Sequence, residues 1–252
     1  MLLTIDIGNT RLKLGLFRED NLIKKEGIPL QSIDNVESCE SLLSDFIGQF
    51  KEVQGVCVSS VVPDKTLLII TALSEIIKTS CIIVTSETKT GLDLSPLKNP
   101  QTLGADRIAC AAWAFHTYRK PICIVDFGSA TTISIIDGKG RFIGGAIIPG
   151  VDMMAKCLSN NTASLPLIEL TEPINLPANN TLTAVVSGII IGTAGGVERI
   201  ISEIEREMGY KLFVVITGGN AVFAAPYLNI ENVIEQDISL KGLRAIYELN
   251  RD

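Results

Sequence analysis

The sequence LLTIDIGNTRLKLGLF, residues 2–17, contains the pattern that decides the fold. An apolar run ends in Asp6, and a glycine and small polar residues then lead into a second strand-like run. The stretch CIVDFGSATTISIID, residues 123–137, repeats this design with Asp126 in the place of Asp6. In each copy, turn residues and a third strand candidate follow, at 21–29 and at 141–149. Two matching hairpins predict a duplicated β-β-β unit and therefore two related lobes.

The segments between and after these hairpins switch between helical and strand-like periodicity. We expect helices at 42–50, 64–80, 102–118, 183–209 and 240–250, and strands at 55–62, 81–85 and 211–217. Strand hairpins mixed with α/β crossovers predict an α/β fold, with one mixed sheet and flanking helices in each lobe. The expected domains are 1–117 and 118–237, and the last helix, 238–252, is a candidate to pack back on the first lobe.

Composition and charge exclude several classes of partner. The chain has 252 residues, of which 46% are hydrophobic and 20% charged, and its net charge is −6. These values are typical of a globular protein and exclude a disordered one. Because the balance is acidic and no lysine and arginine cluster is longer than Lys24-Lys25, we expect no nucleic-acid partner. The uncharged stretch 181–197 is shorter than a membrane span, so we expect a buried, close-packed helix there and no membrane partner.

The cysteines and the N-terminus favour a cytoplasmic location. The six cysteines are widely spaced and form no CxxC pair for zinc or redox chemistry. Four of them lie in apolar runs where we expect buried thiols; they are Cys57, Cys81, Cys110 and Cys123. The chain opens directly into MLLTIDIGNT without the pattern of a signal peptide. Free thiols are typical of a reducing compartment.

The two hairpin turns have the residue types of a phosphate site. In the first turn, the Asp6 carboxylate could hold hydrated Mg²⁺ directly or through water, and Gly8 would let main-chain N–H groups approach phosphate oxygens. Asn9 and Thr10 could donate hydrogen bonds, and Lys13 could present a cation. A single copy is equally compatible with an ordinary hairpin turn. The second copy, at Asp126, favours a phosphate clamp in which the two turns face one cleft.

Two further turns are candidates for ligand binding. Gly104-Ala105-Asp106-Arg107 opens a predicted helix, and Arg107 there opposes the helix dipole, which favours an anion or carboxylate ligand over a purely structural role. Gly218 and Gly219 follow an apolar strand and could let adenine lie against the backbone, or they could only turn the chain. Neither a GxxxxGK[ST] nor a GxGxxG sequence is present, which argues against P-loop and Rossmann folds.

Taken in order, these motifs resemble type III pantothenate kinases, members of the acetate kinase/sugar kinase/actin-like ATPase superfamily with its ribonuclease H-like duplication. The motifs are DIGNT (6–10), GADR (104–107), DFGSATT (126–132), GGAIIPG (144–150) and TGGN (217–220). The resemblance spans nearly the whole chain. It implies a homodimer that phosphorylates pantothenate with ATP to 4′-phosphopantothenate, the first step of coenzyme A synthesis. It also implies dependence on Mg²⁺ and on K⁺ or NH₄⁺.

The resemblance assigns roles to individual residues. It implies that Asp106 is the catalytic base, that Asp126 binds the monovalent cation and that Ser129 contacts the nucleotide. The implied phosphate-binding hairpin consists of Asp6, Ile7, Gly8, Asn9, Thr10, Arg11, Leu12 and Lys13. The implied substrate-binding residues are Leu97, Gly104, Ala105, Asp106, Arg107 and Thr181. Leu97 departs from the family, which usually has a tyrosine there; leucine keeps an apolar wall but lacks the phenol hydroxyl.

Two alternatives stay open from the sequence. One is a non-catalytic, ATP-binding regulator of the same fold, because relatives of this family include an accessory factor associated with transcription. The retained Asp106 argues against it, since a pure binding module needs no general base. The other alternative keeps the fold and changes the reaction, to a kinase for another hydroxyl compound or to a phosphatase.

Overall fold

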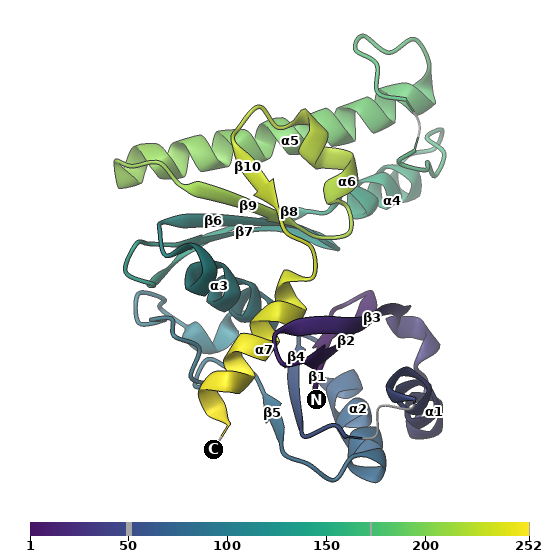
Figure 1. The fold of residues 1–252 in the computed structure, drawn as a ribbon. Helices are drawn as coiled ribbons and strands as arrows, with labels where there is room; N and C mark the ends of the chain where they lie inside the picture. The colour runs from purple at the N-terminus through teal and green to yellow at the C-terminus, as the bar shows by residue number, and fades with distance from the viewer. Residues whose placement is uncertain (49–51, 172, 252) are drawn as a thin grey trace. The chain divides into compact units, whose positions relative to one another are not determined.

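The structure, a computed structural model, describes residues 1–48, 52–171 and 173–251. The chain divides into two compact units (Figure 1). The first unit comprises Met1–Arg119, Gly140–Phe142 and Asp237–Asp252, and the second comprises Lys120–Lys139 and Ile143–Gln236. In the described part of the chain, each unit contains one five-stranded sheet.

The first sheet has the strand order β3-β2-β1-β4-β5. Its strands are β1 (Leu2–Ile7), β2 (Arg11–Arg18), β3 (Asn21–Pro29), β4 (Gly55–Ser60) and β5 (Cys81–Ile83). The hairpin β1-β2-β3 is antiparallel, whereas β4 pairs with β1 and β5 pairs with β4 in parallel. The central strand β1 is buried at every position, as expected for a strand covered on both faces.

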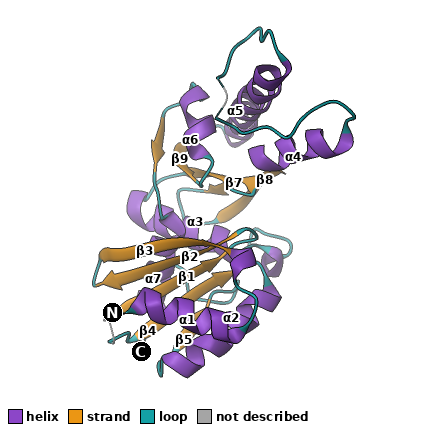
Figure 2. Cartoon of the chain, turned by 90° about the vertical axis from the view of Figure 1, so that its right-hand side faces the viewer, coloured by secondary structure: helices purple, strands orange, loops and turns teal. Residues whose placement is uncertain are grey.

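Helices cover both faces of this sheet (Figure 2). They are α1 (Val36–Ile47), α2 (Pro63–Ile76), α3 (Ala105–Tyr118) and α7 (Ile238–Asn250). Side chains of α1 and α2 pack on the face formed by Leu3, Ile5 and Ile7 of β1. Side chains of α3 and α7 pack on the opposite face, where Cys57 of β4 belongs to the same buried cluster. The C-terminal helix is therefore part of the first unit.

The second sheet repeats the topology of the first. Its order is β10-β9-β6-β7-β8, with β6 (Ile122–Phe127), β7 (Ala130–Ile136), β8 (Phe142–Pro149), β9 (Phe213–Thr217) and β10 (Asn232–Ile234). Strands β6 and β7 form an antiparallel hairpin, and β9 pairs in parallel with both β6 and β10. Each central strand thus has a hairpin partner on one side and parallel strands on the other, which confirms the predicted duplication.

The helices of the second unit are α4 (Val151–Asn161), α5 (Thr181–Met208) and α6 (Ala221–Ala224). Helix α5 begins after Asn180, whose side chain accepts a hydrogen bond from the Thr183 N–H group at 3.0 Å. It ends at Gly209 in the left-handed conformation, φ 75°. By length and composition alone α5 could cross a membrane, but half of its most apolar window is buried inside the protein.

Several expected boundaries differ from the structure. The helix expected at 64–80 ends at Ile76, and the helix expected from 102 begins at Ala105, after a short 3₁₀ turn. Phe50, the last residue of the helix expected at 42–50, lies outside the described residues. The expectation for Cys81 is wrong: this thiol is exposed on the short strand β5, whereas Cys39 of α1 is buried. Apolar sequence around Cys81 does not imply burial at the edge of a sheet.

Candidate active site

Three polar side chains form a row across the first sheet. The strand register places Asp6 of β1 directly between Lys13 of β2 and Ser59 of β4. The Ser59 hydroxyl donates a hydrogen bond to Asp6 Oδ1 at 2.8 Å, and Lys13 Nζ lies 3.4 Å from Asp6 Oδ2. Asp6 is 4% exposed, so a charged carboxylate is held inside the sheet by one hydroxyl and one cation.

The turn that follows β1 leaves polar groups accessible. The Gly8 N–H donates to the Arg11 carbonyl at 3.0 Å and closes the hairpin, and the side chains of Asn9 and Thr10 are exposed. The Arg11 guanidinium donates to the Gly27 carbonyl at 2.8 Å.

Two members of the expected phosphate-binding hairpin belong to the core. Ile7 and Leu12 are fully buried in the cluster beneath the sheet. Their side chains therefore stabilise the hairpin, and any contact that these two residues make with a phosphate must come from the main chain.

The first turn of α3 positions Asp106 over this row. Ala105 and Ala109 of α3 pack in one buried cluster with Cys57, which lies two residues before Ser59 in β4. Asp106 Oδ1 accepts a hydrogen bond from the Arg107 main-chain N–H at 2.8 Å. A Cβ atom at Gly104 would lie 2.5 Å from the same oxygen, so a larger residue there would displace this carboxylate.

The electrostatics of Asp106 suit a proton acceptor. Burial raises the pKa of its carboxyl above the usual range, and the negative charge of Asp6 raises it further. The Arg107 amide, the Arg107 guanidinium and Lys13 lower this pKa in part. These influences place Asp6, Lys13 and Asp106 in one electrostatic cluster. A carboxylate with a raised pKa is a stronger base than an ordinary aspartate.

Arg107 lies in the first turn of α3, and Leu97 lies in the loop that precedes this helix. Burial lowers the pKa of Arg107, but an arginine still stays protonated at neutral pH. The guanidinium carbon of Arg107 lies 5.5 Å from the centre of the Phe142 ring. Leu97 is half-buried in a loop turn closed by its N–H and the Leu94 carbonyl at 3.1 Å. Ala105 is buried, so its side chain is part of the packing of α3.

In the second unit, three loops meet around Asp126. Asp126 is the penultimate residue of β6 and pairs with Thr132 of β7 and Thr217 of β9. Gly218 has φ +98°, and a Cβ atom there would lie 2.5 Å from the Phe127 carbonyl oxygen. A Cβ atom at Gly150, which precedes α4, would lie 2.6 Å from the Gly128 carbonyl oxygen. Glycines at 150 and 218 therefore allow the three loops to approach closely.

Further contacts hold these loops together. The Asn220 main-chain N–H donates to the Phe127 carbonyl at 2.9 Å, and the Asn220 side chain donates to Asp152 Oδ2 at 2.8 Å. Ser129 is half-buried beside Asp126, whereas Gly219 is exposed. Thr181 is exposed at the first position of α5, at the far end of the polar segment that precedes this helix.

Sequence reasoning missed Ser59, the role of Gly150 and the contact between Asn220 and Asp152. The serine stands in the apolar strand GVCVSS, and nothing local marks it as a partner of Asp6. The GGAIIPG motif contains Gly150, and the close approach that requires it was not predicted. The expectation that Asp6 and Asp126 face one cleft stays a prediction, because each turn is described within its own unit.

The donor set fits a sparsely ligated Mg²⁺ ion. No group of three or more histidine, cysteine or acidic side chains that could hold a metal lies within residues 1–48, 52–171 and 173–251. Mg²⁺ in phosphoryl-transfer enzymes needs only one or two carboxylates, with phosphates and water completing its shell. Asp6, with its neighbour Asp106, supplies carboxylates of that number. The repulsion between these two carboxylates would also be relieved by a cation.

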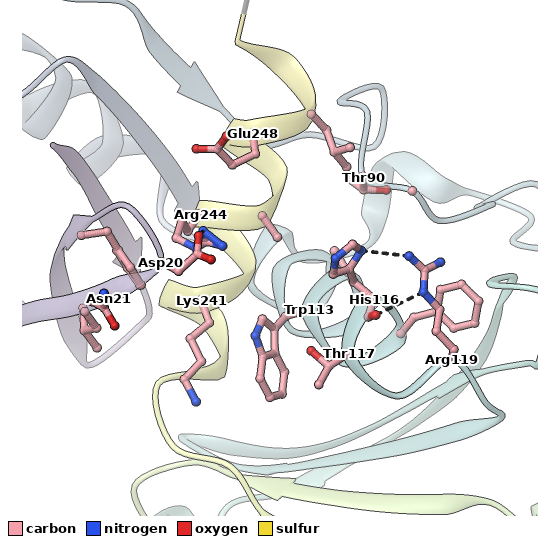
Figure 3. A pocket seen from close by; sticks show the side chains of 17 residues that line it. Asp20, Asn21, Thr90, Trp113, His116, Thr117, Arg119, Lys241, Arg244 and Glu248 are labelled. Carbon is pink, nitrogen blue, oxygen red and sulfur yellow. Dashed lines mark hydrogen bonds and ion pairs between the residues drawn. The ribbon is translucent and has the colours of Figure 1, made fainter.

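A separate pocket of about 670 Å³ lies at the other end of α3 (Figure 3). Its cationic side chains are already engaged within the protein. Arg119 donates to the His116 carbonyl and contacts the His116 ring nitrogen, and Lys241 lies 4.8 Å from the centre of the Trp113 ring. Arg244 forms an ion pair with Asp20. This pocket contains none of the expected site residues.

Comparison with known proteins shows the family. The family model described as type III pantothenate kinase matches residues 2–203. A type III pantothenate kinase from Brevibacillus brevis is 37% identical over 255 residues, covering 100% of both chains. One from Moorella thermoacetica is 35% identical over 254 residues, covering 99% of this chain and 100% of the other.

Solved structures show the fold at lower identity. The ethanolamine utilization protein EutJ from Carboxydothermus hydrogenoformans matches with a TM-score of 0.58 and 13% identity, covering 97% of this chain and 89% of the other. This likeness concerns the fold alone. Matches over the full length at more than a third identity, together with the two repeated units, decide the classification: the chain belongs to the type III pantothenate kinase family.

Proposed function

We propose that the protein transfers the γ-phosphoryl group of ATP to the hydroxyl of pantothenate, the first step of coenzyme A synthesis. Membership of the family supports the reaction. The observation that carries the proposal is the cluster of Asp106, Asp6 and Lys13 in one unit, where Asp106 is half-buried and the pKa of its carboxyl is raised. A basic carboxylate beside a phosphate-binding turn is the arrangement that a hydroxyl acceptor needs.

On the acceptor side, Asp106 orients the hydroxyl and accepts its proton. Arg107 follows directly in the helix and offers a charged, two-pronged donor to the carboxylate or amide oxygens of pantothenate. Gly104 keeps the space next to Asp106 open. Leu97 supplies an apolar wall and Thr181 a hydroxyl to the substrate.

On the donor side, the turn from Gly8 to Thr10 offers main-chain and side-chain donors to phosphate oxygens, and Lys13 adds a positive charge. Mg²⁺, when bound with ATP, neutralises charge on the phosphates, and Asp6 is the residue that would hold it, directly or through water. Phosphoryl transfer proceeds through a loose transition state, so positioning and charge neutralisation supply most of the acceleration.

The second unit provides the nucleotide and monovalent-cation contacts of this proposal. Asp126 offers one carboxylate among neutral hydroxyl and carbonyl oxygens, a charge suited to K⁺ or NH₄⁺. Ser129 contacts the nucleotide from the β6-β7 turn. The glycine pair Gly218 and Gly219 leaves room for a flat base, since Gly219 is exposed and a Cβ atom there would meet no described residue within 4 Å.

The active form in this proposal is a cytoplasmic homodimer built on α5. Small residues follow one another along an exposed face of this helix: Ala184, Gly188, Gly192 and Gly195. Among the described residues, nothing lies within 4 Å of a Cβ atom built at any of these three glycines. Such a face allows the close approach of a second helix, and a two-fold dimer is the simplest closed assembly.

The test is a phosphoryl-transfer assay with ATP and pantothenate, run in potassium, ammonium and sodium buffers. We expect Asp106→Asn to lower kcat by about 10²–10⁴-fold with ATP binding nearly intact. Arg107→Ala should instead raise the KM for pantothenate. Asp64→Asn is the matched control, because Asp64 is an exposed acid in the first turn of α2.

Four outcomes would contradict this assignment. Nearly full kcat in Asp106→Asn would make Asp106 a structural residue. ATP binding without turnover of pantothenate would favour a regulator, and turnover of another alcohol would favour a different kinase. Equal activity in sodium and potassium would remove the role of Asp126 as a cation ligand.

A further inference from the structure

We propose that Ser59 is a positioning residue that holds the Asp6 carboxylate in the orientation needed to receive metal-bound ATP. The inference rests on the proposed function for its meaning, but it concerns a side chain to which neither the sequence motifs nor the family resemblance assigns a role. Ser59 lies on β4, which is outside the hairpin that contains Asp6 and Lys13.

The geometry leaves the carboxylate few partners. Asp6 is 4% exposed and Ser59 is fully buried, so bulk water cannot replace the hydroxyl as a donor. Ser59 Oγ lies 2.8 Å from Asp6 Oδ1, which is the normal length for a hydroxyl donating to a carboxylate. Lys13 Nζ lies at 3.4 Å from the other oxygen and its side chain is 41% exposed. The shorter, buried contact therefore determines how the carboxylate plane is turned.

The placement of Ser59 in its strand supports the same role. The β4 sequence GVCVSS is apolar and buried until it reaches the level of Asp6, where the parallel register pairs Ser59 with that aspartate. A buried hydroxyl costs free energy unless it is hydrogen-bonded, and here its bond is made to a functional carboxylate. Ser59 holds Oδ1 from inside the sheet, and this orientation turns Oδ2 toward Lys13 and makes it the oxygen that we expect to face a cation.

Loss of the Ser59 hydroxyl should lower the affinity for metal-bound nucleotide and should leave the binding of pantothenate nearly unchanged. Residues that hold a metal ligand in place typically contribute about 10–100-fold to metal affinity or activity. We therefore expect Ser59→Ala to weaken the binding of Mn²⁺ together with a non-hydrolysable ATP analogue by about 10-fold or more. The KM for pantothenate should stay near that of the wild type, while the KM for Mg²⁺-bound ATP rises. Ser59→Thr keeps the hydroxyl and should restore most of the affinity.

The matched control is Thr4→Val. Thr4 is also fully buried and lies on the same strand and face as Asp6, but its hydroxyl donates to the Gly15 carbonyl at 3.2 Å. This variant should lose stability without losing Mn²⁺–nucleotide affinity. Water-proton relaxation with Mn²⁺ measures that affinity without turnover, and thermal denaturation confirms that each variant is folded. Ser59→Cys is the substitute if the extra methyl of threonine prevents folding.

Two results would overturn the proposal. One is a Ser59→Ala protein that binds Mn²⁺ and the analogue as tightly as the wild type. The other is an equal loss of affinity in Thr4→Val, which would show a general effect of buried hydroxyls on the sheet. If the wild type binds Mn²⁺ and nucleotide but does not phosphorylate pantothenate, the proposed substrate is wrong. The difference in Mn²⁺–nucleotide affinity between the wild type and Ser59→Ala still tests the positioning role of Ser59 in that case.

Discussion

Substituting Gly242 by alanine tests how closely α7 must pack on α3, the helix that contains Asp106, to hold it in place. Gly242 is buried in α7, where it faces the backbone of α3. A Cβ atom there would lie 2.0 Å from the Ala109 carbonyl oxygen, whereas real Cβ contacts are essentially never below 3.0 Å. The obstacle is main chain, so no side-chain rotation can relieve it, and the helices must separate by about 1 Å.

Overpacking of this kind costs about 1–3 kcal/mol. For a protein of this size, each kcal/mol lowers the melting temperature by roughly 2–4 °C. Because Ala109 lies one turn after Asp106, the displacement should also reduce kcat while leaving the KM for ATP nearly unchanged. Thermal and urea denaturation measure the stability, and the pantothenate assay measures kcat.

The control for Gly242→Ala is Gly219→Ala. Among the described residues, a Cβ atom at Gly219 meets nothing within 4 Å, and the backbone there is outside the left-handed region. This substitution should leave the melting temperature almost unchanged. A Gly242→Ala protein that melts with the wild type would refute the close packing of α3 on α7.

Two further predictions concern charge and assembly. Because burial and Asp6 raise the pKa of Asp106, its ionisation destabilises the fold fully above the folded-state pKa, and this cost declines as the pH falls from the folded-state pKa to the unfolded-state pKa of about 4. Asp106→Asn should therefore be more stable than the wild type at about pH 7.5, with a smaller difference at about pH 4, in urea titrations; equal differences at both values would contradict the raised pKa. If the protein forms the proposed homodimer through α5, Gly188→Leu should yield a folded monomer in sedimentation, and a dimer mass that this substitution leaves unchanged would exclude this face of α5 as the interface.

Much of the architecture was predictable because its signals are local. The alternation of apolar residues, the glycine turns after Asp6 and Asp126, and the third strand of each hairpin all lie within a few residues of one another. Strand β3 has the predicted bounds, and the duplicated topology follows from the repeat. Helix boundaries were less accurate, since the ends of α2 and α3 depend on caps and tertiary packing.

The candidate site was predictable only in part, because its motifs are local but the contacts between them depend on tertiary packing. The motifs identified Asp6 and Asp106 separately, because each stands beside a glycine at the end or start of an element. The influence of the Asp6 charge on the pKa of Asp106 arises from the packing of α3 on the sheet, which no sequence pattern specifies. The contribution of Lys13 follows from the antiparallel register of β1 and β2.

The sequence by itself determined the two hairpins, the acidic turn at the end of each central strand and, through its motifs, the resemblance to a kinase family. Only the tertiary structure decided that Ser59 donates to Asp6 and that Gly242 meets the backbone of α3. The physical reason is distance along the chain. Hairpins and turns are specified by neighbouring residues, whereas the pairing of β1 with β4 and the crossing of α3 and α7 bring together segments that only the folded core holds in contact.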